Sequence, residues 1–206
     1  MRTRIKICGI TRLEDARAAA EAGADAIGLV FYPPSPRYLE VEWARELRFS
    51  LPPFVAAVAL FVNPDAETVL DVVSRVKPDL LQFHGEETPE FCAGFGLPYL
   101  KACRVKPGVD LIKYLLPYRG AAGWLADAHV EGYGGAGKSF DWSLIPETRP
   151  RPLVLSGGLT VANVGDAIRR VRPWGVDVSS GVEADKGLKD AAKIAAFVAE
   201  VKNADV

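Results

Sequence analysis

At residues 153–183 the chain reads LVLSGGLTVANVGDAIRRVRPWGVDVSSGVE. Two short apolar runs, Leu153–Ser156 and Gly175–Ser179, have the composition of buried strands, and each is followed at once by a turn rich in Gly and Ser. Val161–Val171 lies between them and has the spacing of an amphipathic helix. A strand, a helix and a second buried strand in this order are typical of a parallel sheet covered by helices. The stretch therefore predicts an α/β fold.

The same alternation extends back to the N-terminus. The other predicted strands are Arg4–Cys8, Ala24–Phe31, Phe54–Phe61, Leu80–His84, Tyr99–Arg104 and Gly123–Asp127. The other predicted helices are Leu13–Ala22, Glu40–Phe49, Asp65–Val76 and Lys189–Lys202, with weaker helical patterns at 88–94, 109–115 and 141–145. Eight such units without a linker predict one domain over residues 1–206, a single-domain (β/α)8 TIM barrel.

An open, doubly wound sheet is the alternative fold. It usually has fewer strands and carries a glycine fingerprint after its first strand. Here the first predicted strand ends in Cys8-Gly9-Ile10 instead. The closed barrel is therefore favoured.

Composition excludes several classes of protein. The formal net charge is −1 and no block of Lys or Arg is present, so no nucleic-acid partner is expected. No apolar segment is long enough to span a bilayer and the N-terminus lacks a signal-peptide pattern, which predicts a cytoplasmic protein without a membrane partner. Cys8, Cys92 and Cys103 are far apart and form no Cys/His cluster, so neither disulfides nor a metal site is expected.

Residues 132–139, GYGGAGKS, match the phosphate-binding pattern of nucleotide hydrolases letter for letter. That pattern functions only when a strand leads into the loop and a helix follows at once. Four residues separate this stretch from the strand ending at Asp127, and Pro146 leaves room for barely two helical turns afterwards. We therefore interpret the stretch as a glycine-rich loop over the barrel mouth rather than as a nucleotide site.

Reactive groups of such barrels lie at the carboxyl ends of the strands and on the loops that follow. The turns after the seventh and eighth strands would bring together backbone N–H donors for a phosphate dianion, with Gly157 and Gly158 in one turn and Ser180 and Gly181 in the other. Two tight turns that need glycine for conformational reasons are the simpler alternative. Their adjacent position favours a phosphate site.

Three further residues could carry chemistry. A lone cysteine is usually a small buried residue, but Lys6 is on the same strand face as Cys8 and would favour its thiolate. Asp127 ends an apolar strand, where burial would keep it protonated as a general acid, although it could equally cap a turn. Arg37 could form a bidentate pair with a carboxylate, or could be a solvated loop residue.

Other polar residues at the strand ends are less specific. Gln82 and His84 share a strand face, where a hydrogen-bonded pair lining the barrel is as well supported as a role in substrate binding. Asp177 occupies the corresponding position on the eighth strand. Phe140 and Trp142 are expected in the core.

Together, several short motifs resemble phosphoribosylanthranilate isomerase over nearly the full length. They are Lys6-Ile7-Cys8-Gly9-Ile10, Gly23–Gly28 with Phe31, Ser35-Pro36-Arg37, Phe61-Val62-Asn63, Gln82-Phe83-His84-Gly85, Gly137–Trp142, Leu155–Leu159 and Val176–Glu183. Each motif is weak alone, whereas their order and spacing are specific. Small departures are Ala136, Phe83 and Ala59, where the family often has Thr or Ser, Leu, and Gly respectively.

The resemblance implies an Amadori rearrangement in tryptophan biosynthesis, without cofactor or metal. It implies Asp127 as general acid, Cys8 as general base, Arg37 as the ligand of the anthranilate carboxylate, and the seventh and eighth loops as the phosphate site. The alternatives are another phosphosugar barrel enzyme, such as an aminoaldose isomerase or an indole-glycerol phosphate synthase-like lyase, and a non-catalytic phosphosugar-binding barrel. A homodimer is compatible with the apolar loop residues, which the sequence cannot rank.

Overall fold

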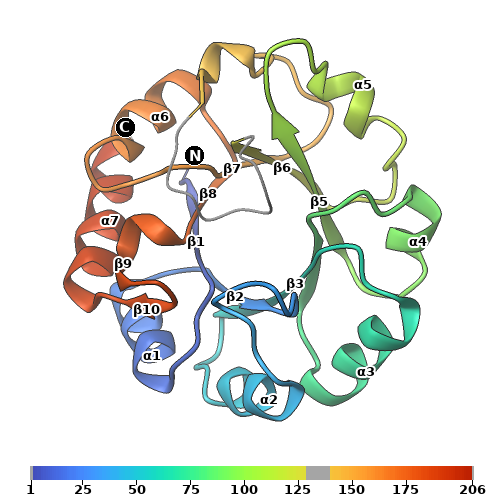
Figure 1. Cartoon of the computed structure of the whole chain (residues 1–206). Helices are drawn as coiled ribbons and strands as arrows, with labels where there is room; N and C mark the ends of the chain where they lie inside the picture. Colours follow the sequence, from blue (N-terminus) through green and yellow to red (C-terminus); the bar gives the residue numbers. More distant parts are fainter. Residues whose placement is uncertain (1, 129–139, 206) are drawn as a thin grey trace.

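The computed structural model describes residues 2–128 and 140–205. Its strands form a closed parallel barrel in chain order, and the helices lie around the outside (Figure 1). The strands are β1 Arg4–Cys8, β2 Ala26–Val30, β3 Ala56–Phe61, β4 Leu80–Phe83, β5 Tyr99–Val105, β6 Gly123–Ala128, β7 Leu153–Leu155 and β8 Gly175–Val178. The helices are α1 Leu13–Ala22, α2 Val41–Phe49, α3 Ala66–Val76, α4 Pro89–Ala93, α5 Leu111–Leu115, α6 Val164–Val171 and α7 Ala191–Ala204. The predicted (β/α)8 barrel is confirmed.

The strand register assigns each side chain to one of two faces. Residues in register on neighbouring parallel strands point to the same face, and the face alternates along each strand. One face, represented by Ile7, Phe83 and Trp124, packs with helix residues into the main hydrophobic core. The opposite, inner face carries the polar residues Lys6, Cys8, Gln82, Arg104, Asp127 and Asp177.

Local sequence signals explain where several helices begin and end. The Asp65 carboxylate accepts the backbone N–H of Thr68 at the start of α3, and Asp190 accepts those of Ala192 and Lys193 at the start of α7. Gly23 ends α1 in the left-handed conformation at φ 99°, which glycine adopts without a steric cost.

Two regions differ from the sequence predictions. The helix predicted at 141–145 is wrong: only a 3-10 turn forms, Trp142–Leu144, because Pro146 follows too closely for a longer helix. A small antiparallel hairpin, β9 Glu183–Asp185 with β10 Leu188–Lys189, was not predicted, and it takes Lys189 out of the predicted last helix. Phe140 and Trp142 lie half-buried against the core, in agreement with the prediction.

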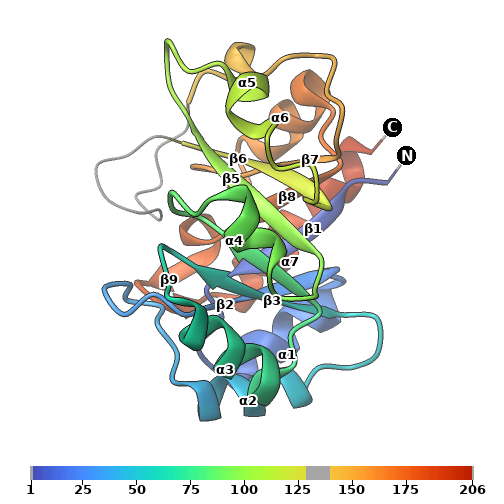
Figure 2. The ribbon, with the colours of Figure 1, turned by 90° about the vertical axis from the view of Figure 1, so that its right-hand side faces the viewer.

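The two ends of the barrel are unlike. Figure 2 shows both chain termini on the side of the amino ends of the strands, where the loop between α2 and β3 also projects. Phe54 in this loop is fully exposed, with a left-handed φ of 71°. Within the described residues, no helix has the length and apolar character needed to cross a membrane.

Candidate active site

The carboxyl end of the inner face holds a buried ion pair. Lys6 Nζ donates to Asp177 Oδ1 at 2.9 Å, and both side chains are less than a tenth exposed. The pair arises because Lys6 and Asp177 are in register on β1 and β8. The Lys6 ammonium therefore lies close to Cys8, which is two residues further along β1 on the same face.

Cys8 is buried beside this pair, next to a gap left by a glycine. A Cβ built on Gly28 would lie 2.6 Å from the Cys8 Sγ and 3.1 Å from the Lys6 Nζ, so only glycine leaves room for both groups. Burial raises the pKa of the Cys8 thiol above its ordinary value, and the neighbouring Lys6 only partly opposes this rise. Lys6 thus favours the thiolate, as expected, but desolvation outweighs the ammonium and the net shift favours the thiol.

Asp127 on β6 contacts His84, which directly follows β4, two strands away in the barrel. His84 Nε2 lies 2.9 Å from Asp127 Oδ2, and Gln82 Nε2 lies 3.1 Å from His84 Nδ1. All three side chains are at least nine-tenths buried. The predicted Gln82–His84 pair on the barrel lining thus exists, and its imidazole contacts the candidate acid.

Arg37 is buried rather than solvated. Its Nε and Nη2 donate to the two carboxylate oxygens of Glu183, each at 2.7 Å. Lys189 Nζ donates to the same carboxylate at 2.9 Å. The bidentate pairing predicted for Arg37 is therefore made within the protein, to a residue of the β9–β10 hairpin.

The turns after β7 and β8 need glycine at several positions. Gly157 and Gly158 have φ values of 84° and 64°, where other residues are strained. Ser180 and Gly181 begin a 3-10 turn, Ser180–Val182, and a Cβ on Gly181 would overlap the Leu159 carbonyl oxygen of the neighbouring turn. The two turns are therefore packed directly against each other at the barrel mouth.

Comparison with known proteins identifies the family of the chain. The family model of N-(5'-phosphoribosyl)anthranilate isomerase matches residues 5–200. The chain belongs to this isomerase family.

Individual relatives cover almost the whole chain. The N-(5'-phosphoribosyl)anthranilate isomerase of Dechloromonas aromatica is 59% identical over 100% of this chain and 99% of its own length. The crystal structure of phosphoribosyl anthranilate isomerase from Thermotoga maritima is 49% identical, with a TM-score of 0.91 over 98% of this chain and 99% of that one. A further solved isomerase structure, in complex with reduced 1-(o-carboxyphenylamino)-1-deoxyribulose 5-phosphate, is 46% identical, with a TM-score of 0.87 over 98% and 99% of the two chains.

Sequence reasoning missed three residues at the mouth of this isomerase-family barrel. The sequence patterns place Glu183 in a motif without a separate role, predict Lys189 in a helix, and indicate no role for Gly28 at the site. A usable signal existed for Glu183, since an acidic residue directly after a Gly-rich turn can reach across the barrel mouth. Nothing in the local pattern distinguishes Lys189 from the lysines of the following helix.

Other predictions lie outside this site. The GYGGAGKS stretch, residues 132–139, falls outside the described residues, so its interpretation stays a prediction. Among the described residues, no group of three or more His, Cys, Asp and Glu could hold a metal ion.

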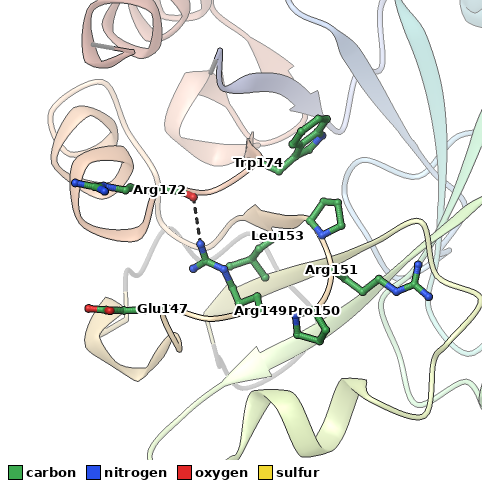
Figure 3. A pocket seen from close by; sticks show the side chains of 8 residues that line it. Glu147, Arg149, Pro150, Arg151, Leu153, Arg172 and Trp174 are labelled. Carbon is green, nitrogen blue, oxygen red and sulfur yellow. Dashed lines mark hydrogen bonds between the residues drawn. The ribbon is translucent and has the colours of Figure 1, made fainter.

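The structure also has a pocket of about 350 Å³ at the amino ends of β7 and β8, at the opposite end of the barrel. Arg149, Arg151, Arg172 and Trp174 contribute to its lining, and Figure 3 shows that the three arginine side chains diverge. Arg149 donates to the carbonyl oxygens of Val171 and Arg172 at 3.0 and 3.2 Å. The pocket therefore presents no convergent set of charged groups.

Proposed function

We propose that the chain catalyses the Amadori rearrangement of N-(5-phosphoribosyl)anthranilate to 1-(2-carboxyphenylamino)-1-deoxy-D-ribulose 5-phosphate in tryptophan biosynthesis. The observation that carries this proposal is the full-length family match on a barrel with a buried thiol and a buried carboxyl on its inner face. The reaction is an aldose–ketose isomerisation and needs an acid and a base.

Asp127 is the proposed acid. Its proton goes to the ribose ring oxygen while the C1–O bond breaks, and the nitrogen lone pair forms the C1=N bond of a protonated Schiff base. The contact with His84 holds the carboxyl group in place, at 2.9 Å from the ring nitrogen. Gln82 in turn orients the imidazole. In this proposal Gln82 and His84 support the acid in addition to lining the substrate site.

Cys8 is the proposed base. It removes the proton from C2, the C–H electrons form the C1=C2 bond of an enolamine, and the C1=N electrons return to nitrogen. Reprotonation at C1 and loss of the hydroxyl proton then give the ketone. Burial raises the pKa of Cys8 and so favours the thiol in the free protein. Lys6 opposes this rise, which reduces the free-energy cost of forming the thiolate.

The two ends of the substrate have separate proposed anchors. Arg37 binds the anthranilate carboxylate, and Gly157, Gly158, Ser180 and Gly181 present backbone N–H groups to the phosphate. Asp177 contributes by holding Lys6 beside Cys8. Anchoring both ends fixes the sugar between acid and base, which removes much of the entropic cost of reaction.

The direct test uses fluorescence. Purified protein mixed with freshly prepared phosphoribosylanthranilate should abolish the anthranilate-type emission at a rate proportional to enzyme concentration. Persistent emission would refute the isomerase assignment. Turnover of a phosphosugar without the anthranilate group, but not of this substrate, would favour a different phosphosugar barrel enzyme.

We further propose that the chain acts as a single-domain cytoplasmic enzyme and forms a homodimer. The three cysteines are free, which suits a reducing compartment. One solved relative, the isomerase of Thermotoga maritima, is described as dimeric. Phe54 is the most exposed large apolar side chain among the described residues, and an apolar contact is its simplest use. Sedimentation equilibrium should give twice the chain mass, and Phe54→Ser should weaken the association.

A further inference from the structure

Three buried charged side chains form a compact group beside the site, which we name the Arg37 cluster: Arg37, Glu183 and Lys189. Arg37 comes from the loop after β2, and the other two come from the β9–β10 hairpin. The Glu183 carboxylate accepts from both Arg37 and Lys189, at 2.7 to 2.9 Å. Each of the three residues is less than a tenth exposed.

The cluster carries one net positive charge. Burial would raise the pKa of Glu183, but the hydrogen bonds from Arg37 and Lys189 outweigh it and hold that pKa below its ordinary value. Burial lowers the pKa of Lys189, yet its Nζ has three acceptors, Ser179 O, Ser179 Oγ and Glu183 Oε1. The Glu183 carboxylate and the Ser179 carbonyl can only accept, and the charge of the adjacent carboxylate favours the ammonium form of Lys189. Two cations therefore share one anion.

Glu183 binds only one edge of the Arg37 guanidinium group. Nε and Nη2 are occupied by Glu183, and Nη1 makes no hydrogen bond to any residue that the structure describes. The stem is fixed as well, because a Cβ on Gly9 would overlap the Arg37 Cδ. The guanidinium therefore has no freedom to turn its bidentate edge toward a ligand.

We propose that Glu183 and Lys189 are specificity-determining positioning residues: Glu183 turns the Nη1 edge of Arg37 toward the aryl carboxylate of the substrate, and Lys189 preserves the positive charge that attracts it. The inference rests on the proposed function for the identity of the ligand. Without Lys189 the Arg37–Glu183 pair would be neutral, and a neutral pair gives a carboxylate little electrostatic reason to leave water. One unpaired positive charge makes the site complementary to one carboxylate.

Binding measurements test the charge directly. The first ligand is reduced 1-(2-carboxyphenylamino)-1-deoxyribulose 5-phosphate, and the second is the same compound with a phenylamino group that lacks the carboxylate. Lys189→Met should weaken the first ligand about tenfold by calorimetry, as expected for loss of a nearby buried charge. It should leave the second ligand unchanged. Binding of the second ligand also reports that the variant is folded.

A double variant separates charge from structure. Glu183→Gln with Lys189→Met restores the net positive charge, and the glutamine oxygen can still accept from Arg37, so affinity for the carboxylate ligand should recover to within about threefold of the parent. If the two residues only hold the hairpin together, the double variant will bind no better than Lys189→Met. Lys186→Met is the matched control, because Lys186 is exposed on the same hairpin, and it should change neither affinity.

Two results would overturn the inference: equal loss of both ligands in Lys189→Met, or failure of the double variant to recover. In steady-state turnover, Lys189→Met should raise KM with a much smaller effect on kcat. A parent protein that binds the carboxylate ligand more tightly than its analogue but turns over no phosphoribosylanthranilate would refute the proposed function and leave this inference standing.

Discussion

The two ends of the barrel arrange their charged side chains in different ways. At the carboxyl ends of the strands, Lys6 and Asp177 face each other inside the barrel, and Arg37 faces Glu183 across two loops. At the amino ends, the side chains of the arginines around the pocket diverge (Figure 3), and Arg149 donates its hydrogen bonds to main-chain carbonyl oxygens. These four charged side chains at the carboxyl end pair with one another, whereas the three arginines around the pocket do not converge.

This difference suggests a rule: paired buried charges belong to the proposed active site, whereas arginines bonded to main-chain carbonyls stabilise the fold. Burying charged groups is costly unless each is paired, and a buried pair is seldom the most stable choice for a fold. The pairs at the carboxyl end are therefore better explained by the proposed binding and chemistry than by stability alone. An arginine that caps the end of a helix and a loop is explained by stability alone. The following predictions test this contrast, beginning with the largest effect.

Changing the acid or the base should nearly abolish activity at the carboxyl end. Asp127→Asn and Cys8→Ser should each reduce kcat by at least about a hundredfold, as loss of a general acid or base does, with little change in affinity for the product analogue. Stopped-flow fluorescence gives the rate and calorimetry gives the affinity. Near-normal kcat in either variant would remove that residue from its proposed role.

The sequence predicted the positions of residues at the strand ends better than the contacts between their side chains. Cys8, Asp127 and Asp177 were placed correctly because position at a strand end follows from the barrel repeat, which local periodicity specifies. Glu183 and Lys189 were missed because their partner, Arg37, lies far away in the sequence, and ion pairing across loops leaves no periodic signal. The sequence could not predict the raised pKa of Cys8 for a related reason. The balance between burial and the Lys6 charge depends on distances in three dimensions.

Adding a side chain where the turns after β7 and β8 pack together, at the proposed phosphate site, should have the next largest effect on activity. A Cβ on Gly181 would overlap a backbone oxygen that cannot move aside cheaply, so the turns after β7 and β8 would separate. Gly181→Ala should raise KM about tenfold through displaced N–H donors, with a smaller change in kcat. Gly120→Ala is the matched control, because its new Cβ would make only an ordinary contact with Tyr99 at 3.4 Å. An unchanged KM in Gly181→Ala would argue against these turns as the phosphate site.

The pH dependence of Cys8 alkylation should report the balance at the base. Because burial raises its pKa, the thiolate increases only at a pH above that of an ordinary thiol, and the iodoacetamide rate should rise there. Lys6→Met removes the cation that lowers this pKa, so the rise should move to still higher pH. Cys92 and Cys103, with pKa values raised by burial to about 12, should stay unmodified in the folded protein, as mass spectrometry of peptides can check. A rise centred below the ordinary thiol pKa would contradict the dominance of burial.

The smallest effect is expected at the amino end, where it should fall on stability alone. Arg149 donates to Pro146, Val171 and Arg172 carbonyl oxygens, and burial lowers the pKa of its guanidinium. Arg149→Met keeps the length of the side chain but loses these bonds, so unfolding in urea should require about 1 kcal/mol less, while kcat and KM stay within about twofold of the parent. The carbonyls lie near the surface, where water can replace the lost donors, which limits the cost. A KM shift as large as that of Gly181→Ala would mean that the two ends of the barrel are coupled, and the contrast between site and support would then fail.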